Sequence, residues 1–255
     1  MIQRSGFIER VLLVLGSHAF TIPVVSFVHE VGHIIAMNLI GITRYILVIN
    51  PFTESSATPM VSIPSEHMLF VSASGMIFQT IIFGALAILL WRRKSVTLLP
   101  LTVCVPMSML NVGSYLLMGS IVDGSDVILM VEAGVPTLAV QIIGILFLIL
   151  GIWTYARLQP VAGFNKESPV AEIFMPLFLG TGIYSVVMTF YGYMSGYGTI
   201  IGSINIVTSI IFGAVYTLLL KRSPVKIEPN IPSRIDAYKV LGTGLTTIIL
   251  CFLIF

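Results

Sequence analysis

Long apolar segments, separated by short polar ones, make up most of this chain. Charged residues delimit seven of these segments, at 11–42, 68–91, 96–122, 138–156, 171–193, 199–220 and 240–255. About 20 apolar residues in a helix cross a hydrocarbon core of about 30 Å. The pattern therefore predicts an all-α polytopic membrane protein with six or seven transmembrane helices, and seven is the count that the segments favour.

The first apolar segment is unusual in its length. From Val11 to Thr43 it would extend about 50 Å as a helix, more than one perpendicular crossing needs. Pro23 lies inside it, and proline removes a backbone hydrogen bond. We therefore expect a kinked or broken element whose main span runs from Pro23 to Ile40. The last segment, 240–255, is short and is expected to tilt little or to lie partly in the interface.

The polar stretch between the first two spans has a different pattern. Residues 44–67 contain two short β-prone runs separated by a turn region rich in Thr, Ser and Glu. Such a pattern is typical of a β-hairpin. We expect a short strand-like hairpin at the membrane surface, and no separate soluble domain anywhere in the chain.

The composition supports a membrane location. Of 255 residues, 56% are hydrophobic and 9% are charged, and the mean hydropathy is +1.02. A soluble domain carries about 25% charged residues, so an ordinary soluble enzyme and a disordered chain are excluded. The net charge of +2 offers no electrostatic footprint for nucleic acid. Cys104 and Cys251 both lie in apolar segments and have no disulfide or zinc-ribbon spacing.

Lysine and arginine positions predict the orientation of the chain. If the N-terminus is cytoplasmic and the chain crosses seven times, all 13 Lys and Arg residues except Arg44 fall on the cytoplasmic side. Basic residues are retained on that side during insertion. We therefore predict a cytoplasmic N-terminus and a C-terminus on the opposite side.

Three ionisable residues stand close together inside the first apolar segment. The sequence His29-Glu30-Val31-Gly32-His33 has the pattern HExxH. Residues four apart share one face of a helix, so both imidazoles can bind one Zn²⁺ while Glu30 reaches a metal-bound water. Zinc acidifies that water and the carboxylate accepts its proton. The pattern predicts His29 and His33 as zinc ligands and Glu30 as the general base.

A catalytic zinc needs a third protein ligand. Acidic residues at membrane depth are costly, and the remaining candidates lie at the end of a later span, in the sequence Asp123-Gly124-Ser125-Asp126. The two aspartates are three residues apart and can share a helix face. One of them, Asp123 or Asp126, is expected to bind the metal. The other either orients a metal-binding histidine or is a solvated loop acid.

These features together resemble the site-2 protease family of intramembrane zinc metalloproteases. The resemblance covers about residues 23–130 and rests on the HEVGH helix, the strand-like segment after it, the small residues Ser72-Ala73-Ser74-Gly75 and the Asp-Gly pair at Asp123. In that family the two motif histidines and the aspartate of the Asp-Gly motif bind zinc. The resemblance implies Asp123 as third ligand if this rule holds, or Asp126 if a Gly-Ser-Asp variant does.

The sequence thus predicts an intramembrane zinc metalloendopeptidase that hydrolyses peptide bonds within or beside transmembrane segments. Its partners would be a membrane-protein substrate and the lipid bilayer. The protease-like core is expected in residues 1–137, followed by further transmembrane helices in 138–255. The alternative is a non-proteolytic membrane scaffold or a metal-ion carrier with the same fold. A carrier would favour ionisable residues within several spans, and the spans from Leu138 onward hold none internally.

Overall fold

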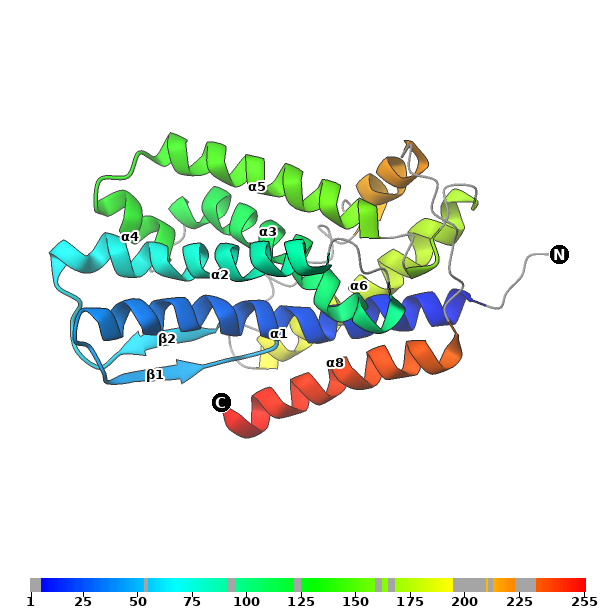
Figure 1. The fold of residues 1–255 in the computed structure, drawn as a ribbon, viewed down its shortest axis with the longest axis horizontal. Coiled ribbons are helices and arrows are strands. Elements are labelled where there is room, and N and C mark those ends of the chain that lie inside the picture. Colours follow the sequence, from blue (N-terminus) through cyan, green and yellow to red (C-terminus); the bar gives the residue numbers. More distant parts are fainter. Residues whose placement is uncertain are drawn as a thin grey trace.

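A bundle of long helices with one small hairpin makes up the computed structural model of this chain (Figure 1). It describes residues 6–52, 55–90, 95–121, 125–158, 162–164, 168–194, 210, 213–222 and 233–255. The elements are α1 (Phe7–Leu39), β1 (Tyr45–Val48), β2 (Ser56–Pro59), α2 (Met68–Leu90), α3 (Leu99–Met118), α4 (Asp126–Glu132), α5 (Thr137–Leu158), α6 (Val170–Met194) and α8 (Arg234–Ile254).

Six helices in the described residues are long and apolar enough to cross a membrane, namely α1, α2, α3, α5, α6 and α8. The protein is an integral multi-pass membrane protein, which confirms the predicted fold class. The seventh predicted segment, 199–220, lies mostly outside the described residues. Its described part, from Gly213 onward, is helical.

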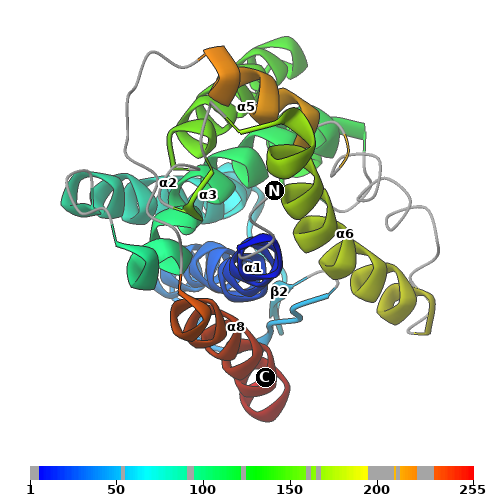
Figure 2. The ribbon, with the colours of Figure 1, turned by 90° about the vertical axis from the view of Figure 1, so that its right-hand side faces the viewer.

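The first helix is continuous, so of the two expected alternatives, a kinked or a broken element, the broken element is wrong. α1 runs through Pro23 without interruption for 33 residues. It lies at the centre of the bundle, in contact with α2, α3, α6 and α8 (Figure 2). Pro23 removes one backbone hydrogen bond, but neighbouring helices on several sides hold the chain helical on both sides of it.

The last helix begins earlier than the hydropathy pattern predicted. α8 starts at Arg234 and has 21 residues, enough for a full crossing. The Ser233 hydroxyl accepts a hydrogen bond from the Asp236 backbone N–H at 3.1 Å and caps the first turn. The charged residues at the start of this helix, among them Arg234 and Asp236, lie before the apolar segment 240–255, which is delimited by charge.

The hairpin is present between the first two spans, as predicted. β1 and β2 are antiparallel, with Leu47 opposite Ala57. β2 packs along α1, and the turn that follows β1 contacts two further helices. Phe52 in that turn contacts Tyr184 of α6 and Phe252 of α8, with ring centroids 5.8 and 5.9 Å apart.

The largest buried apolar cluster joins the two halves of the chain. It includes Leu13 of α1, Leu110 of α3, Tyr155 of α5, Leu177 of α6 and Val240 of α8. These side chains pack around the N-terminal half of α1. The C-terminal half of α1 contains the polar residues His29, Glu30 and His33, all of them buried.

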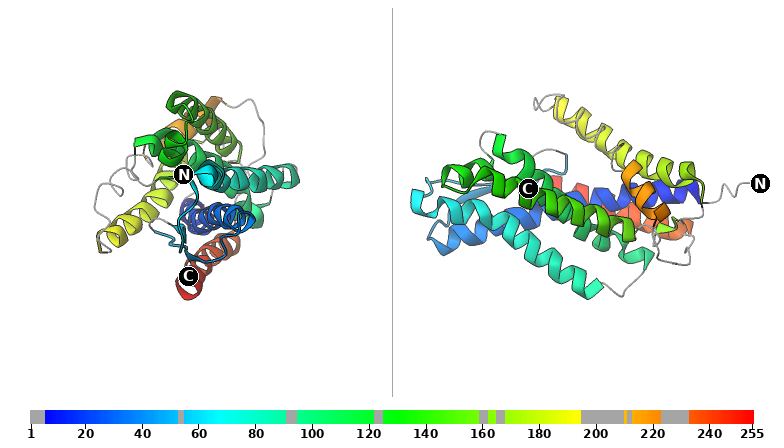
Figure 3. Two further views of the ribbon diagram at one scale, coloured as in Figure 1. Left: turned by 90° about the vertical axis from the view of Figure 1, so that its left-hand side faces the viewer. Right: turned by 90° about the horizontal axis from the view of Figure 1, so that it is seen from above.

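One helix departs from the compact bundle. Figure 3 shows the ribbon of α6 diverging from the other helices toward its C-terminal end, where Tyr191 keeps a ring contact with Phe252 of α8. The apolar side chains Val186, Phe190 and Tyr193 near that end are exposed. In a membrane protein such a surface faces lipid, because hydrocarbon is as apolar as the side chains themselves.

Glycines allow α1 and α8 to approach closely. A Cβ atom on Gly16 would lie 2.6 Å from Leu241 Cα, and one on Gly244 would lie 2.4 Å from the Gly16 carbonyl oxygen. Both distances are shorter than van der Waals contact. The backbones can therefore pack at this separation only because small residues face one another.

We expect Gly244→Ala to separate α8 from α1 and to lower the stability of the protein by about 1–3 kcal/mol, the usual effect of overpacking. Gly242→Ala is the matched control, because nothing lies within 4 Å of a Cβ at that position on the same helix. Thermal unfolding in detergent would show a lower Tm for Gly244→Ala alone. Equal Tm values for the two variants would contradict the close α1–α8 contact.

Candidate metal centre

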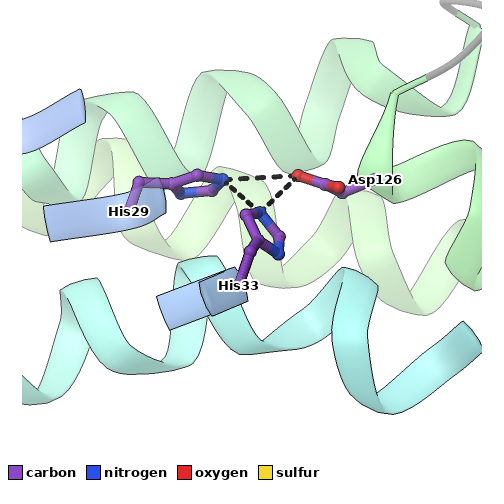
Figure 4. A group of neighbouring side chains, drawn as sticks. All are labelled: His29, His33 and Asp126. Atoms are coloured by element: carbon purple, nitrogen blue, oxygen red, sulfur yellow. Dashed lines mark hydrogen bonds and ion pairs between the residues drawn. The ribbon is translucent and has the colours of Figure 1, made fainter. Parts of the chain in front are cut away.

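One turn of α1 brings the two motif histidines together. His29 and His33 are four residues apart, and their rings meet edge to face with centroids 4.8 Å apart. Their Nε2 atoms lie 3.1 Å from each other. Figure 4 shows both rings directed toward the same point, on the side of α1 that faces α4.

The third member of the group comes from the short helix α4. Asp126 is the first residue of α4, and the hydroxyl of Ser125 caps this helix by accepting from the Ile128 N–H at 3.1 Å. Tyr115 on α3 holds the aspartate in place. Its hydroxyl donates to Asp126 Oδ2 at 3.3 Å and accepts from the Asp126 backbone N–H at 3.2 Å.

The carboxylate of Asp126 meets both imidazoles. Asp126 Oδ2 lies 3.3 Å from His29 Nε2 and 3.1 Å from His33 Nε2 (Figure 4). Among the residues that the structure describes, His29, His33 and Asp126 are the one group of three His, Cys, Asp or Glu side chains close enough to share a metal ion.

The outer nitrogens of both rings are engaged by acceptors. His29 Nδ1 lies 3.0 Å from Gln79 Oε1, and His33 Nδ1 lies 2.8 Å from the Val71 carbonyl oxygen. An oxygen that accepts requires a proton on each Nδ1, so each neutral ring turns a lone pair at Nε2 toward Asp126. Three electron-pair donors then point at one another.

A positive charge between these donors is needed to offset their repulsion. A proton on one Nε2 can bridge only two of the three atoms at a time, whereas a metal cation can meet all three. His29 Nε2, His33 Nε2 and Asp126 Oδ2 form a triangle with sides of 3.1, 3.1 and 3.3 Å. A point at its centre is about 1.8 Å from each atom, just under the zinc–ligand distances of about 2.0–2.1 Å. The donor set and its size therefore fit Zn²⁺.

Helix α2 comes close to the two histidines at a glycine. A Cβ atom on Gly75 would lie 2.5 Å from His33 Nε2 and 2.7 Å from His29 Nε2. Any side chain at this position would occupy the space of the ligand atoms. Gly75 therefore leaves the room in which the two imidazoles converge.

Glu30 lies in a cavity beside this group. The cavity has a volume of about 550 Å³ and is lined by residues of α1, β2, α2, α3 and α4, the three metal-binding candidates and Glu30 among them. Glu30 is 7% exposed, and its carboxylate lies near the backbone N–H of Ala57 on β2, which also lines the cavity. The cavity is large enough for a short peptide segment beside the histidines.

The structure thus brings together four of the five residues predicted for the site, His29, Glu30, His33 and Asp126. Asp123 lies outside the described residues. Sequence reasoning did not identify Gln79 and Tyr115, which contact the metal-binding candidates. A lone glutamine in the apolar segment 68–91 was a signal for the first, since a buried amide in a span requires partners.

A scan against models of known protein families, a search of curated proteins and a search of solved structures found no match.

We expect Gly75→Ala to reduce metal binding by at least about tenfold, because its methyl group would displace both imidazoles. Gly84→Ala on the same helix is the matched control, with nothing within 4 Å of the added Cβ. Metal content of the purified, zinc-reconstituted proteins would measure the difference. Equal metal content in Gly75→Ala and the wild type would contradict this placement of α2.

Proposed function

We propose that this protein is an intramembrane zinc metalloprotease that hydrolyses peptide bonds within or beside the transmembrane segments of membrane-protein substrates. The convergence of His29, His33 and Asp126 beside the buried Glu30 carries this proposal. Three protein ligands that leave a further position open are the arrangement of catalytic zinc sites, whereas structural zinc sites are closed by four. The adjoining cavity supplies the space for a substrate.

The proposed chemistry divides between the metal and Glu30. Zn²⁺, when bound, would polarise the scissile carbonyl and lower the pKa of an attacking water. Glu30 accepts a proton from that water at a carboxylate oxygen and delivers it to the nitrogen of the departing amine. The Glu30 carboxylate and the Ala57 N–H both face the cavity. His29, His33 and Asp126 bind and orient the metal.

The hairpin offers a means of holding a substrate extended. The Met60 N–H donates to the Arg44 carbonyl, so these two residues form a hydrogen-bonded pair of the hairpin. Such pairs alternate along antiparallel strands with pairs that are not hydrogen-bonded, so the backbone groups of Ala57 and Pro59 point away from β1. The Ala57 N–H lies near Glu30, which puts this edge of β2 at the cavity. A transmembrane helix hides its peptide bonds and must unwind to be cut. An unwound segment would donate its own backbone N–H groups to the outward carbonyl oxygens of Ala57 and Pro59 on this edge.

Substitutions at the four site residues test this function. We expect about one zinc per wild-type chain, loss of zinc in His29→Ala and Asp126→Ala, and full zinc with no cleavage in Glu30→Gln. Asp123→Ala is expected to keep its zinc, since Asp126 already completes the set. The measurements are metal content and cleavage of a reconstituted transmembrane peptide.

Each other outcome has a clear meaning. A wild type without zinc after reconstitution refutes the proposed protease. Zinc without cleavage in the wild type favours the scaffold, and wild-type cleavage by Glu30→Gln refutes the general-base role. Loss of zinc in Asp123→Ala but not in Asp126→Ala would transfer the third ligand to Asp123.

We also propose that the N-terminus is cytoplasmic. The start of α1 and the end of α5 lie at one end of the bundle, together with the start of α8 (Figure 1). Arg10, Arg157 and Arg234 belong to these helix ends, whereas Arg44 follows the opposite end of α1. Basic residues gathered at one end mark the cytoplasmic side.

Tags at the two termini test this orientation. A protease added outside intact cells should spare an N-terminal tag and remove a C-terminal one, because the seven crossings predicted from the sequence would put the ends on opposite sides. Permeabilised cells, in which both tags should be lost, provide the control. Removal of the N-terminal tag from intact cells would reverse the orientation.

A further inference from the structure

Gln79 is a completely buried amide in an apolar helix. It lies on α2 with 0% of its surface exposed. Removing an amide from water without partners is costly, so a buried glutamine requires hydrogen bonds at both of its polar atoms. Gln79 has them: its side chain contacts His29 on α1 and two residues of α3.

The contacts on α3 fix the orientation of the amide. Gln79 Nε2 lies 3.1 Å from the Ser108 carbonyl oxygen, 3.1 Å from the Ser108 hydroxyl and 3.2 Å from Asn111 Oδ1. A backbone carbonyl can only accept, so the side-chain nitrogen of Gln79 must face α3. Its oxygen, Oε1, must then face His29.

The orientation of Gln79 determines the tautomer of His29. Gln79 Oε1 lies 3.0 Å from His29 Nδ1, and an oxygen can pair with this nitrogen only if the nitrogen carries the proton. The lone pair of the neutral ring is then at Nε2, the atom directed at His33 and Asp126. For His33 the backbone carbonyl of Val71 has the same effect. Because Gln79 acts through its side chain, a substitution at this position can change the tautomer of His29.

We propose that Gln79 is a positioning residue of the metal site: it anchors to α3 and holds His29 as the Nδ1–H tautomer with Nε2 aimed at the metal. This inference rests on the proposed zinc site. It predicts a preformed site, in which His29 does not have to change tautomer or rotate before it binds. Groups that orient a metal-binding histidine in this way typically contribute 10- to 100-fold in metal affinity.

The first test is the zinc affinity of the full-length protein in detergent, measured by competition with a chromophoric chelator. We expect Gln79→Met, which keeps the volume but loses both hydrogen-bonding ends, to bind zinc about 10- to 100-fold more weakly. Gln79→Asn, one methylene shorter, should lose at least about tenfold and is a milder change should Gln79→Met fail to fold. Thr80→Val is the matched control on the same helix, since within the described part of the chain the Thr80 hydroxyl bonds only to its own helix, at the Met76 carbonyl.

Gln79→Glu distinguishes a role of Gln79 in positioning His29 from a role in helix packing alone. Gln79→Glu keeps an acceptor oxygen for His29 Nδ1 although it loses the donors to α3. It should therefore bind zinc more tightly than Gln79→Met. A cobalt-substituted sample gives a second reading, because a displaced imidazole changes the visible absorption of Co²⁺.

The second test reads the tautomer directly and needs no metal. The chain has only four histidines, so ¹⁵N-histidine spectra of the metal-free protein are simple, and His29→Ala assigns the signal of His29. We expect the Nδ1–H tautomer of His29 in the wild type and in Thr80→Val, and a mixture of tautomers in Gln79→Met.

The outcomes distinguish this inference from the proposed function. Zinc binding by the wild type, with equal affinity and an unchanged cobalt spectrum in Gln79→Met and Gln79→Asn, overturns the positioning role and leaves the protease proposal intact. A wild type that binds no zinc refutes both. An Nε2–H tautomer of His29 in the wild type overturns the inference whatever the affinity.

Discussion

Three electron-pair donors that point at one another inside a bundle of apolar helices are the feature on which this structure depends. His29 and His33 turn their Nε2 lone pairs toward the Asp126 carboxylate, at distances that require a positive charge between them. Their repulsion is strong where the dielectric constant is low. The surrounding elements hold the donors together. Gly75 on α2 leaves room for the imidazoles. The two rings are oriented by the hydrogen bonds that they donate to Gln79 and Val71, and the carboxylate by the one that it accepts from Tyr115.

The need to bring the histidines of α1 close to α2 also explains how closely the two helices approach. A Cβ atom on Gly32, within the motif of α1, would lie 2.7 Å from the Ser74 carbonyl oxygen of α2. The two glycines, Gly32 and Gly75, therefore allow the helices to meet with little space between their backbones. Gln79 lies one turn further along α2, where the helices are still near enough for its amide to reach both His29 and α3. Close helix packing and the polar network are thus parts of one arrangement.

The second half of the chain reaches the site through the hairpin. The Tyr184 hydroxyl on α6 donates to the Pro51 carbonyl, and Phe52 packs against Tyr191 of α6 as well as Phe252 of α8. These contacts attach the turn of the hairpin to two helices that are distant in sequence from the HExxH motif. β2, in turn, lines the cavity that contains Glu30. The position of the strand beside the cavity therefore depends on helices outside the predicted core of residues 1–137.

The sequence by itself determined the features that depend on near neighbours. The apolar segments predicted the spans, the β-prone runs predicted the hairpin, and a spacing of four residues put His29 and His33 on one helix face. Only the tertiary structure decided that α1 continues through Pro23, because packing on several sides outweighs one lost hydrogen bond. It alone also brought Asp126 to His29 across 97 residues and gave His29 its partner Gln79 across 50. A local pattern specifies which face a side chain occupies. Which distant side chain meets that face depends on how α2, α3 and α4 pack against α1.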